Sequence, residues 1–163
     1  MSPPPISVCI PIGAWDRAIP RMVDSLLAQD VEFEALVMDA SQDERVGREI
    51  SRLGERVVFW NKGPDGGQCA AIHRAFDRAR GTILTWLNAD DALRPGAMRL
   101  AVETIGADLC DIVYGNAEMV RPDGTFIRAH EGVKPDIGLI YWDCVVSQPS
   151  ARSEERRVGK ECW

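Results

Sequence analysis

Residues 82–91 read Thr-Ile-Leu-Thr-Trp-Leu-Asn-Ala-Asp-Asp. The first six residues are apolar or β-branched, and a short run of this kind with polar residues on both sides is typical of a buried β-strand. The adjacent carboxylates Asp90 and Asp91 follow this strand almost at once. The stretch therefore predicts a buried strand that ends at an acidic site.

Similar apolar segments stand before and after this strand, at residues 6–12, 33–39, 56–60 and 111–114. Apolar residues at helical spacing fill the intervals between them. The helices that they predict cover residues 16–29, 43–53, a segment from the glycine-rich loop 63–67 to Gly81, and 95–105. This alternation predicts an α/β fold with a doubly wound, mostly parallel sheet and helices on both faces.

The composition describes one globular domain of 163 residues with a net charge of −6. The acidic balance and the lack of a basic stripe argue against nucleic acid as a partner. No apolar run approaches the roughly 20 residues that a membrane-spanning helix needs. We therefore expect a cytoplasmic protein without a transmembrane segment, although peripheral association with the inner face of a membrane stays open.

Acidic residues recur where the predicted strands end. Asp39 closes the segment 33–39, Asp65 lies in the loop after the next strand, and Asp90 and Asp91 follow the strand at 82–87. Any one of them alone could cap a helix or form a turn. Together they predict a ligand site, because open parallel sheets bind ligands beyond the carboxyl ends of their strands. Adjacent carboxylates suit a hard divalent cation that takes its other ligands from substrate phosphates.

Two common nucleotide-binding motifs are missing from the sequence. Pro11-Ile12-Gly13-Ala14-Trp15 stands after the first strand, where a dinucleotide-binding GxGxxG motif would lie. The sequence also has no GxxxxGK[ST] motif. These observations argue against a dinucleotide-dependent dehydrogenase and against phosphoryl transfer on a P-loop.

Several segments, taken in order and with their spacing, resemble the family 2 glycosyltransferases of the GT-A fold, which are nucleotide-diphospho-sugar transferase-like proteins. The segments are Ile6–Ile12, Ser25–Gln29, Glu34–Asp39, Asp65–Gln68, Trp86–Asp91 and Pro95–Met98. The resemblance covers roughly residues 6–151. It implies transfer of a sugar, with inversion, from a nucleoside diphosphate sugar to a hydroxyl of a glycan or lipid-linked acceptor, as in cell-surface polysaccharide synthesis.

The resemblance also implies roles for individual residues in binding the nucleoside. Asp39 would face the base, and the backbone of Pro11 and Ile12 would line the nucleoside pocket. Asp65 would lie beside the base or the ribose, and Asp90 would approach the ribose.

The same resemblance assigns the metal to Asp91, which would bind Mg²⁺ or Mn²⁺ on the diphosphate. The resemblance assigns no residue as the catalytic base. Asp136, Asp143 and Glu131 are the acids in the appropriate region of the chain, and none of them is singled out.

Beyond residue 151 the resemblance is lost. Residues 152–162 resemble one translated frame of a common sequencing adapter, whereas the alternative is an ordinary charged tail. We therefore expect a C-terminally truncated, partial donor-binding domain over residues 1–151 and a non-native or disordered tail over 152–163.

Two other functions are compatible with parts of the pattern. A nucleotide-binding fragment or interaction module would bind the same ligand without turnover. A sugar-phosphate nucleotidyltransferase would need a glycine-rich, basic loop after the first strand, and residues 13–17 match that requirement poorly.

Overall fold

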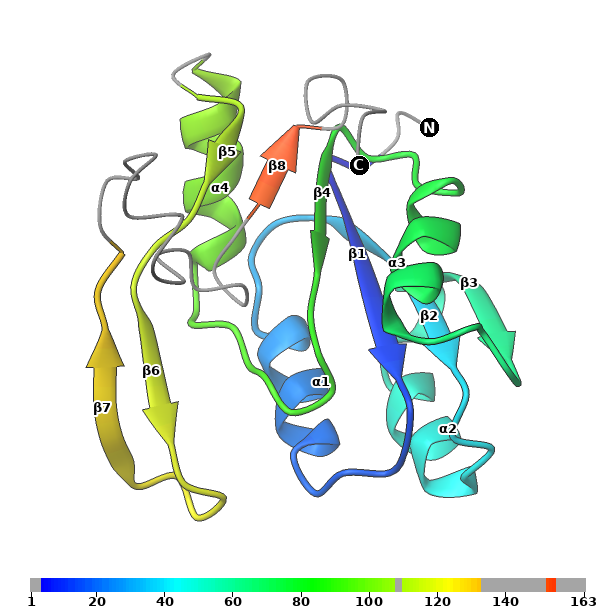
Figure 1. The fold of residues 1–163 in the computed structure, drawn as a ribbon. Helices are drawn as coiled ribbons and strands as arrows, with labels where there is room; N and C mark the ends of the chain where they lie inside the picture. Colours follow the sequence, from blue (N-terminus) through cyan, green and yellow to red (C-terminus); the bar gives the residue numbers. More distant parts are fainter. Residues whose placement is uncertain (1–3, 108–109, 133–151, 155–163) are drawn as a thin grey trace.

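The computed structural model describes residues 4–107 and 110–132 and the backbone of residues 152–154. Figure 1 shows its elements in chain order. They are β1 (Ile6–Ile12), α1 (Ile19–Leu27), β2 (Phe33–Asp39), α2 (Glu44–Ser51), the 3₁₀ turn η1 (Gly54–Arg56), β3 (Val57–Lys62), α3 (Gln68–Phe76), β4 (Ile83–Trp86), α4 (Ala97–Gly106), β5 (Ile112–Val113), β6 (Ala117–Val120), β7 (Phe126–His130) and β8 (Arg152–Glu154).

The main sheet has the strand order β3-β2-β1-β4-β8-β5. β1 lies at its centre and pairs in parallel with both β2 and β4, and β2 pairs in parallel with β3. β8 is antiparallel to its neighbours β4 and β5. The expectation of a mostly parallel α/β sheet is therefore confirmed, with one reversed strand inside it.

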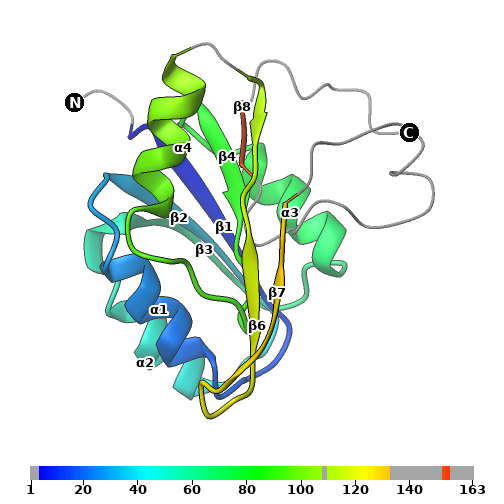
Figure 2. The same cartoon turned by 90° about the vertical axis from the view of Figure 1, so that its left-hand side faces the viewer.

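Helices cover both faces of this sheet. In Figure 2, α1, α2 and α4 lie on one side and α3 lies on the other. The alternation of side chains along β1 explains the arrangement, because Val8 and Ile10 pack into the core beneath α1, whereas Cys9 packs with Ala71 of α3. Both faces of the central strand are thus buried, as its nearly continuous apolar sequence requires.

Two helix boundaries differ by three or more residues from the sequence-based expectation. α1 begins at Ile19 because the Asp16 carboxylate accepts a hydrogen bond from the Ala18 amide at 2.7 Å, which holds a separate turn ahead of the helix. α3 ends at Phe76, so the prediction that Gly81 ends this helix was wrong. A Cβ on Gly81 would lie 2.7 Å from the Ile6 carbonyl carbon, and glycine is needed there for close approach of two backbones.

The C-terminal part of the described chain contains elements that the sequence analysis did not predict. β6 and β7 form a separate antiparallel hairpin beside the main sheet (Figure 1). Arg152–Glu154, which we placed in a non-native or disordered tail, form β8 inside the main sheet. The backbone of these three residues pairs with β4 and β5, and the expectation of a non-native or disordered tail over residues 152–163 stays a prediction. Residues 133–151 and 155–163 lie outside the described part.

A buried carboxylate joins three segments at the amino-terminal ends of the strands. Glu34 of β2, whose side chain is 2% exposed, accepts a hydrogen bond from Ser7 Oγ at 2.7 Å. It also accepts hydrogen bonds from the Arg80 backbone amide at 2.6 Å and from Arg80 Nε at 2.7 Å. Burial alone would raise the pKa of Glu34, but these hydrogen bonds outweigh it and hold the pKa below the ordinary value of 4.5.

Replacing this carboxylate should destabilise the fold. Glu34→Gln keeps the size of the side chain but turns one acceptor into a donor that faces other donors. We expect the free energy of unfolding, measured in urea at pH 7, to fall by roughly 1.5–3 kcal/mol, the range for hydrogen bonds to charged groups. Glu55→Gln, a matched change at an exposed position, should have little effect. Equal losses in the two variants would contradict this account.

The same variant should show a defined pH dependence. Because the folded pKa of Glu34 is lowered, the ionised carboxylate contributes its full stabilisation above the unfolded pKa of about 4.5. That contribution is lost as the pH falls through the folded value. The difference in stability between wild type and Glu34→Gln should therefore be constant above about pH 5 and shrink on further acidification.

Candidate functional site

Parallel pairing brings the carboxyl ends of the central strands to one edge of the sheet. Ile12 and Asp39 are partners in the β1–β2 register. The Ala40 amide donates to the Ile12 carbonyl at 2.9 Å, and the Gly63 amide donates to the Asp39 carbonyl at 2.8 Å. The loops that follow β1, β2 and β3 are therefore held side by side.

A hollow of about 500 Å³ opens at this edge. Its walls come from the end of β1, the loop before α3 and the turn after β4, and they include Pro11, Ile12, Asp65, Gln68, Asn88 and Asp90. Four of the six predicted site residues therefore line one cavity, whereas Asp39 and Asp91 are not in its wall. A second hollow of about 360 Å³, beside β3, has no ionisable side chain in its lining. The first hollow is consequently the candidate ligand site.

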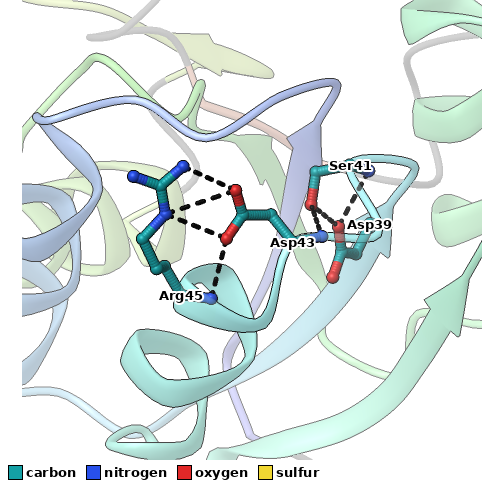
Figure 3. A network of polar contacts seen from close by, with 4 residues as sticks. All are labelled: Asp39, Ser41, Asp43 and Arg45. Carbon is teal, nitrogen blue, oxygen red and sulfur yellow. Dashed lines mark hydrogen bonds and ion pairs between the residues drawn. The ribbon is translucent and has the colours of Figure 1, made fainter.

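Asp39 is the last residue of β2 and is only 4% exposed. Its Oδ1 accepts hydrogen bonds from the backbone amide of Ser41 at 3.0 Å and from Ser41 Oγ at 2.5 Å, as Figure 3 shows. Ser41 Oγ in turn accepts a hydrogen bond from the Asp43 amide at 3.2 Å. Ser41, to which the sequence analysis gave no role, thus fixes the orientation of the Asp39 carboxylate.

The loop after β2 is fixed further by Asp43 and Arg45 (Figure 3). Asp43 caps α2 by accepting the Arg45 amide, and its carboxylate also binds the Arg45 guanidinium, with 2.7 Å between Nη2 and Oδ2. The side-chain hydrogen bonds from Arg45 lower the pKa of Asp43 to about 2. The guanidinium lies 4.8 Å from the ring centroid of Trp15, which follows β1. A cation–π contact therefore connects the loops after β1 and β2.

The loop before α3 is built by Asp65 and two glycines. Gly66 and Gly67 have φ values of 84° and 94°, which few other residues adopt without strain. Asp65 Oδ1 accepts a hydrogen bond from the Gly67 amide at 2.9 Å. Asp65 thus forms a turn, one of the alternatives left open by the sequence, and it also lines the hollow.

Asp90 and Asp91 follow β4 and differ in exposure. Asp90 is exposed, whereas Asp91 is half-buried. Burial and the neighbouring Asp90 charge raise the pKa of Asp91, and a hydrogen bond from Asn88 and the charge of Arg21 counteract the rise only in part. Asn88 Nδ2 donates to Asp91 Oδ2 at 3.1 Å, and Gln68 Nε2 donates to Asn88 Oδ1 at 2.8 Å. Neither amide side chain was among the predicted site residues.

No group of three or more His, Cys, Asp or Glu side chains is placed to hold a metal ion within residues 4–107 and 110–132. Asp90 and Asp91 supply two carboxylates without a third. This donor set fits Mg²⁺ or Mn²⁺ only when a ligand adds its own oxygens, since such ions are commonly bound by one or two carboxylates together with substrate phosphates.

The structure describes one of the three acids considered as the general base. Asp136 and Asp143 lie outside the described residues. Glu131 is exposed just after β7.

Among the described helices, none combines the length and apolarity needed to cross a bilayer.

Comparison with known proteins assigns the fold. The family model described as Glycosyl transferase family 2 matches residues 7–158, which includes part of the segment that we expected to be a tail. The chain is 31% identical over 129 residues to chondroitin synthase from Pasteurella multocida. The match covers 76% of this chain but only 13% of the synthase. The chain therefore corresponds to a small part of that relative's length.

Solved structures show the same architecture. TarS 1–349 from S. aureus superposes with a TM-score of 0.69 at 20% identity, over 94% of this chain and 47% of that one. A mannosyltransferase from Pyrobaculum calidifontis, in complex with GDP-Man and Mn²⁺, superposes with a TM-score of 0.59 at 18% identity, over 76% and 37%. The main sheet and the helices that cover it thus have the GT-A fold.

The electrostatic coupling of the acidic pair can be tested without any ligand. Asp90→Asn removes the neighbouring charge that raises the pKa of Asp91, so that pKa should fall toward its ordinary value of 3.8. Carboxyl ¹³C chemical shifts followed over a pH titration measure it directly. Asp77→Asn, at the exposed residue that follows α3, is the matched control and should leave the pKa of Asp91 unchanged. An unchanged Asp91 titration in Asp90→Asn would refute the coupling.

Proposed function

The chain belongs to glycosyl transferase family 2, and from that premise we propose that it binds a nucleoside diphosphate sugar in the hollow at the carboxyl ends of β1 and β4. One observation carries the proposal. Asp65, Asp90 and the end of β1 line a single cavity, and Asp39 and Asp91 lie at the ends of the strand and turn beside it. The proposed reaction is transfer of the sugar to an acceptor hydroxyl in glycan biosynthesis.

Asp39 is the proposed partner of the nucleoside base. Ser41 engages Oδ1, so Oδ2 is the oxygen that would accept a ring N–H of uracil, thymine or guanine. The backbone of Pro11 and Ile12 would line the nucleoside pocket, since the side chain of Ile12 is 1% exposed and belongs to the core. Asp65 would lie beside the base or ribose, where its turn faces the hollow.

The diphosphate is proposed to lie between α3 and the acidic turn. α3 starts at Gln68 without a side-chain cap, so its first backbone amides are available to an anion. Asp90 would approach the ribose, and Asp91 would hold Mg²⁺ or Mn²⁺ against the diphosphate oxygens. A bound metal supplies positive charge that stabilises the leaving diphosphate. The raised pKa of Asp91 supports this role, because it reflects a carboxylate whose negative charge is poorly compensated in the protein alone.

The proposed transfer inverts the anomeric centre. The acceptor oxygen attacks the anomeric carbon opposite the diphosphate, its proton passes to a general base, and the bond to the diphosphate breaks as the nucleoside diphosphate leaves. We assign no residue to that base. The acceptor is proposed to be a glycan or a lipid-linked acceptor, and the match to chondroitin synthase supports a glycan. The site of action is proposed to be the cytoplasm or the inner face of the membrane.

A second candidate function is nucleotide binding without turnover. The observation that favours it is that the hollow gathers residues suited to a donor nucleotide, whereas no described residue is assigned as the general base. The chain spans 13% of chondroitin synthase and less than half of the two solved relatives. Release of free nucleoside diphosphate in the presence of an acceptor would favour the transferase, whereas binding alone would favour the module.

Asp91→Ala tests the metal site. We expect UDP or GDP to bind wild type more tightly with Mn²⁺ than with EDTA, and we expect Asp91→Ala to lose that difference, because no carboxylate remains to bridge metal and protein at this position. Isothermal titration calorimetry with and without Mn²⁺ measures both values. Asp77→Ala, at the exposed residue that follows α3, is the matched control. Unchanged metal dependence in Asp91→Ala would refute the assigned role.

Asp39→Asn tests the base site independently. The substitution replaces a charged acceptor, so nucleotide affinity should fall about 10- to 100-fold, equivalent to roughly 1.5–3 kcal/mol. The loss should appear both with Mn²⁺ and with EDTA. Pyrophosphate has no base, and its Mn²⁺-dependent binding should be retained in this variant. Equal losses for pyrophosphate and nucleotide would instead indicate general damage to the fold.

A further inference from the structure

We propose that Gln68 and Asn88 form a positioning relay that orients the metal-binding carboxylate of Asp91. The inference rests on the proposed function, because it assumes that Asp91 holds the divalent cation. Neither amide is assigned as a ligand of the cation. Their proposed role is to fix the direction in which the Asp91 carboxylate points before the cation and the nucleotide arrive.

The relay consists of two side-chain hydrogen bonds in series. Gln68 Nε2 donates to Asn88 Oδ1 at 2.8 Å, and Asn88 Nδ2 donates to Asp91 Oδ2 at 3.1 Å. A backbone bond from the Asp91 amide to the Asn88 carbonyl at 3.1 Å closes the turn between the two residues. Asn88 is thus held at both ends of its side chain and by its backbone.

The chemistry of the three side chains permits one polarity for the series. An ionised carboxylate accepts hydrogen bonds and does not donate them, so Asn88 must present its amino group to Asp91. The carbonyl oxygen of Asn88 then faces the opposite way and accepts a hydrogen bond from Gln68. This second bond holds Asn88 in the orientation that suits Asp91.

The relay joins two elements that are separate in sequence. Gln68 is the first residue of α3 and follows Gly66 and Gly67, whereas Asn88 and Asp91 belong to the turn after β4. Gln68 and Asn88 both line the hollow. A ligand that settles on the start of α3 would therefore meet the same side chain that orients Asp91, so the anion site and the metal site are mechanically connected.

Hydrogen bonding at Oδ2 determines which oxygen faces the cation. Because Asn88 engages Oδ2, Oδ1 is the oxygen with which Asp91 would reach a metal. Partners of this kind, one step removed from the metal, commonly change metal affinity 10- to 100-fold when they are mutated. They do so without contacting the metal, which distinguishes a positioning residue from a ligand.

The test compares Mn²⁺ binding in wild type, Gln68→Met, Asn88→Ala and the double variant, each as the full chain with saturating UDP or GDP. Gln68→Met keeps the length and helical propensity of the side chain and removes the amide. Mn²⁺ affinity, followed by electron paramagnetic resonance, should fall about tenfold in each single variant. The double variant should bind Mn²⁺ as tightly as the single variant with the lower Mn²⁺ affinity, because both changes break the same series of hydrogen bonds. Cys69→Ala, the exposed neighbour of Gln68, should match wild type.

The urea unfolding midpoint separates positioning from structure and should be unchanged in Gln68→Met. A fall in the unfolding midpoint that parallels the loss of Mn²⁺ affinity, or additive losses of Mn²⁺ affinity in the double variant, would overturn the relay. Wild-type Mn²⁺ affinity in Gln68→Met would overturn it as well, and if Asp91→Ala then still loses Mn²⁺, the proposed function stands. If Asp91→Ala also binds Mn²⁺ normally, both the proposed metal site and the relay fail.

Discussion

The parallel pairing of β1 with β2 on one side and β4 on the other is the constraint on which the rest of the structure depends. It aligns three carboxyl ends at one edge, with Ile12 opposite Asp39 and Cys9 opposite Trp86. The loops that follow these strands therefore lie together at the carboxyl end of β1. Burial on both faces fixes the register, because a shift by one residue would exchange the side chains under α1 for those under α3.

Two acids at opposite ends of the strands have opposite electrostatic surroundings. At the amino-terminal ends, Glu34 is paired with Arg80 and Ser7, and its pKa is lowered. At the carboxyl ends, the half-buried Asp91 stands next to Asp90, the charge of Arg21 compensates it only in part, and its pKa is raised. A divalent cation bound with a diphosphate would compensate this negative charge, which connects the electrostatics of the site to the proposed chemistry.

Local sequence patterns predicted much of this architecture, and non-local contacts account for most of what they missed. The strand at 33–39 and a helix within 43–53 follow from short-range rules and are confirmed. The role of Gly81 depends on how closely its backbone approaches β1, and β8 depends on partners far away in the chain. The bond between Gln68 and Asn88 likewise needs α3 and β4 to be placed first. The role of Ser41 could have been predicted from the sequence, because a serine shortly after an acidic residue often forms a local hydrogen bond with it.

The central claim is that the acidic edge of the sheet binds a nucleoside diphosphate through a cation held by Asp91. The most direct measurement is a crystal structure of the chain with Mn²⁺ and UDP or GDP, in which anomalous scattering locates the manganese. The account predicts one anomalous peak in direct contact with the Asp91 carboxylate and the diphosphate, with the base beside Asp39. A manganese peak elsewhere on the chain, or a nucleotide bound at this edge with its diphosphate away from Asp91, would contradict it.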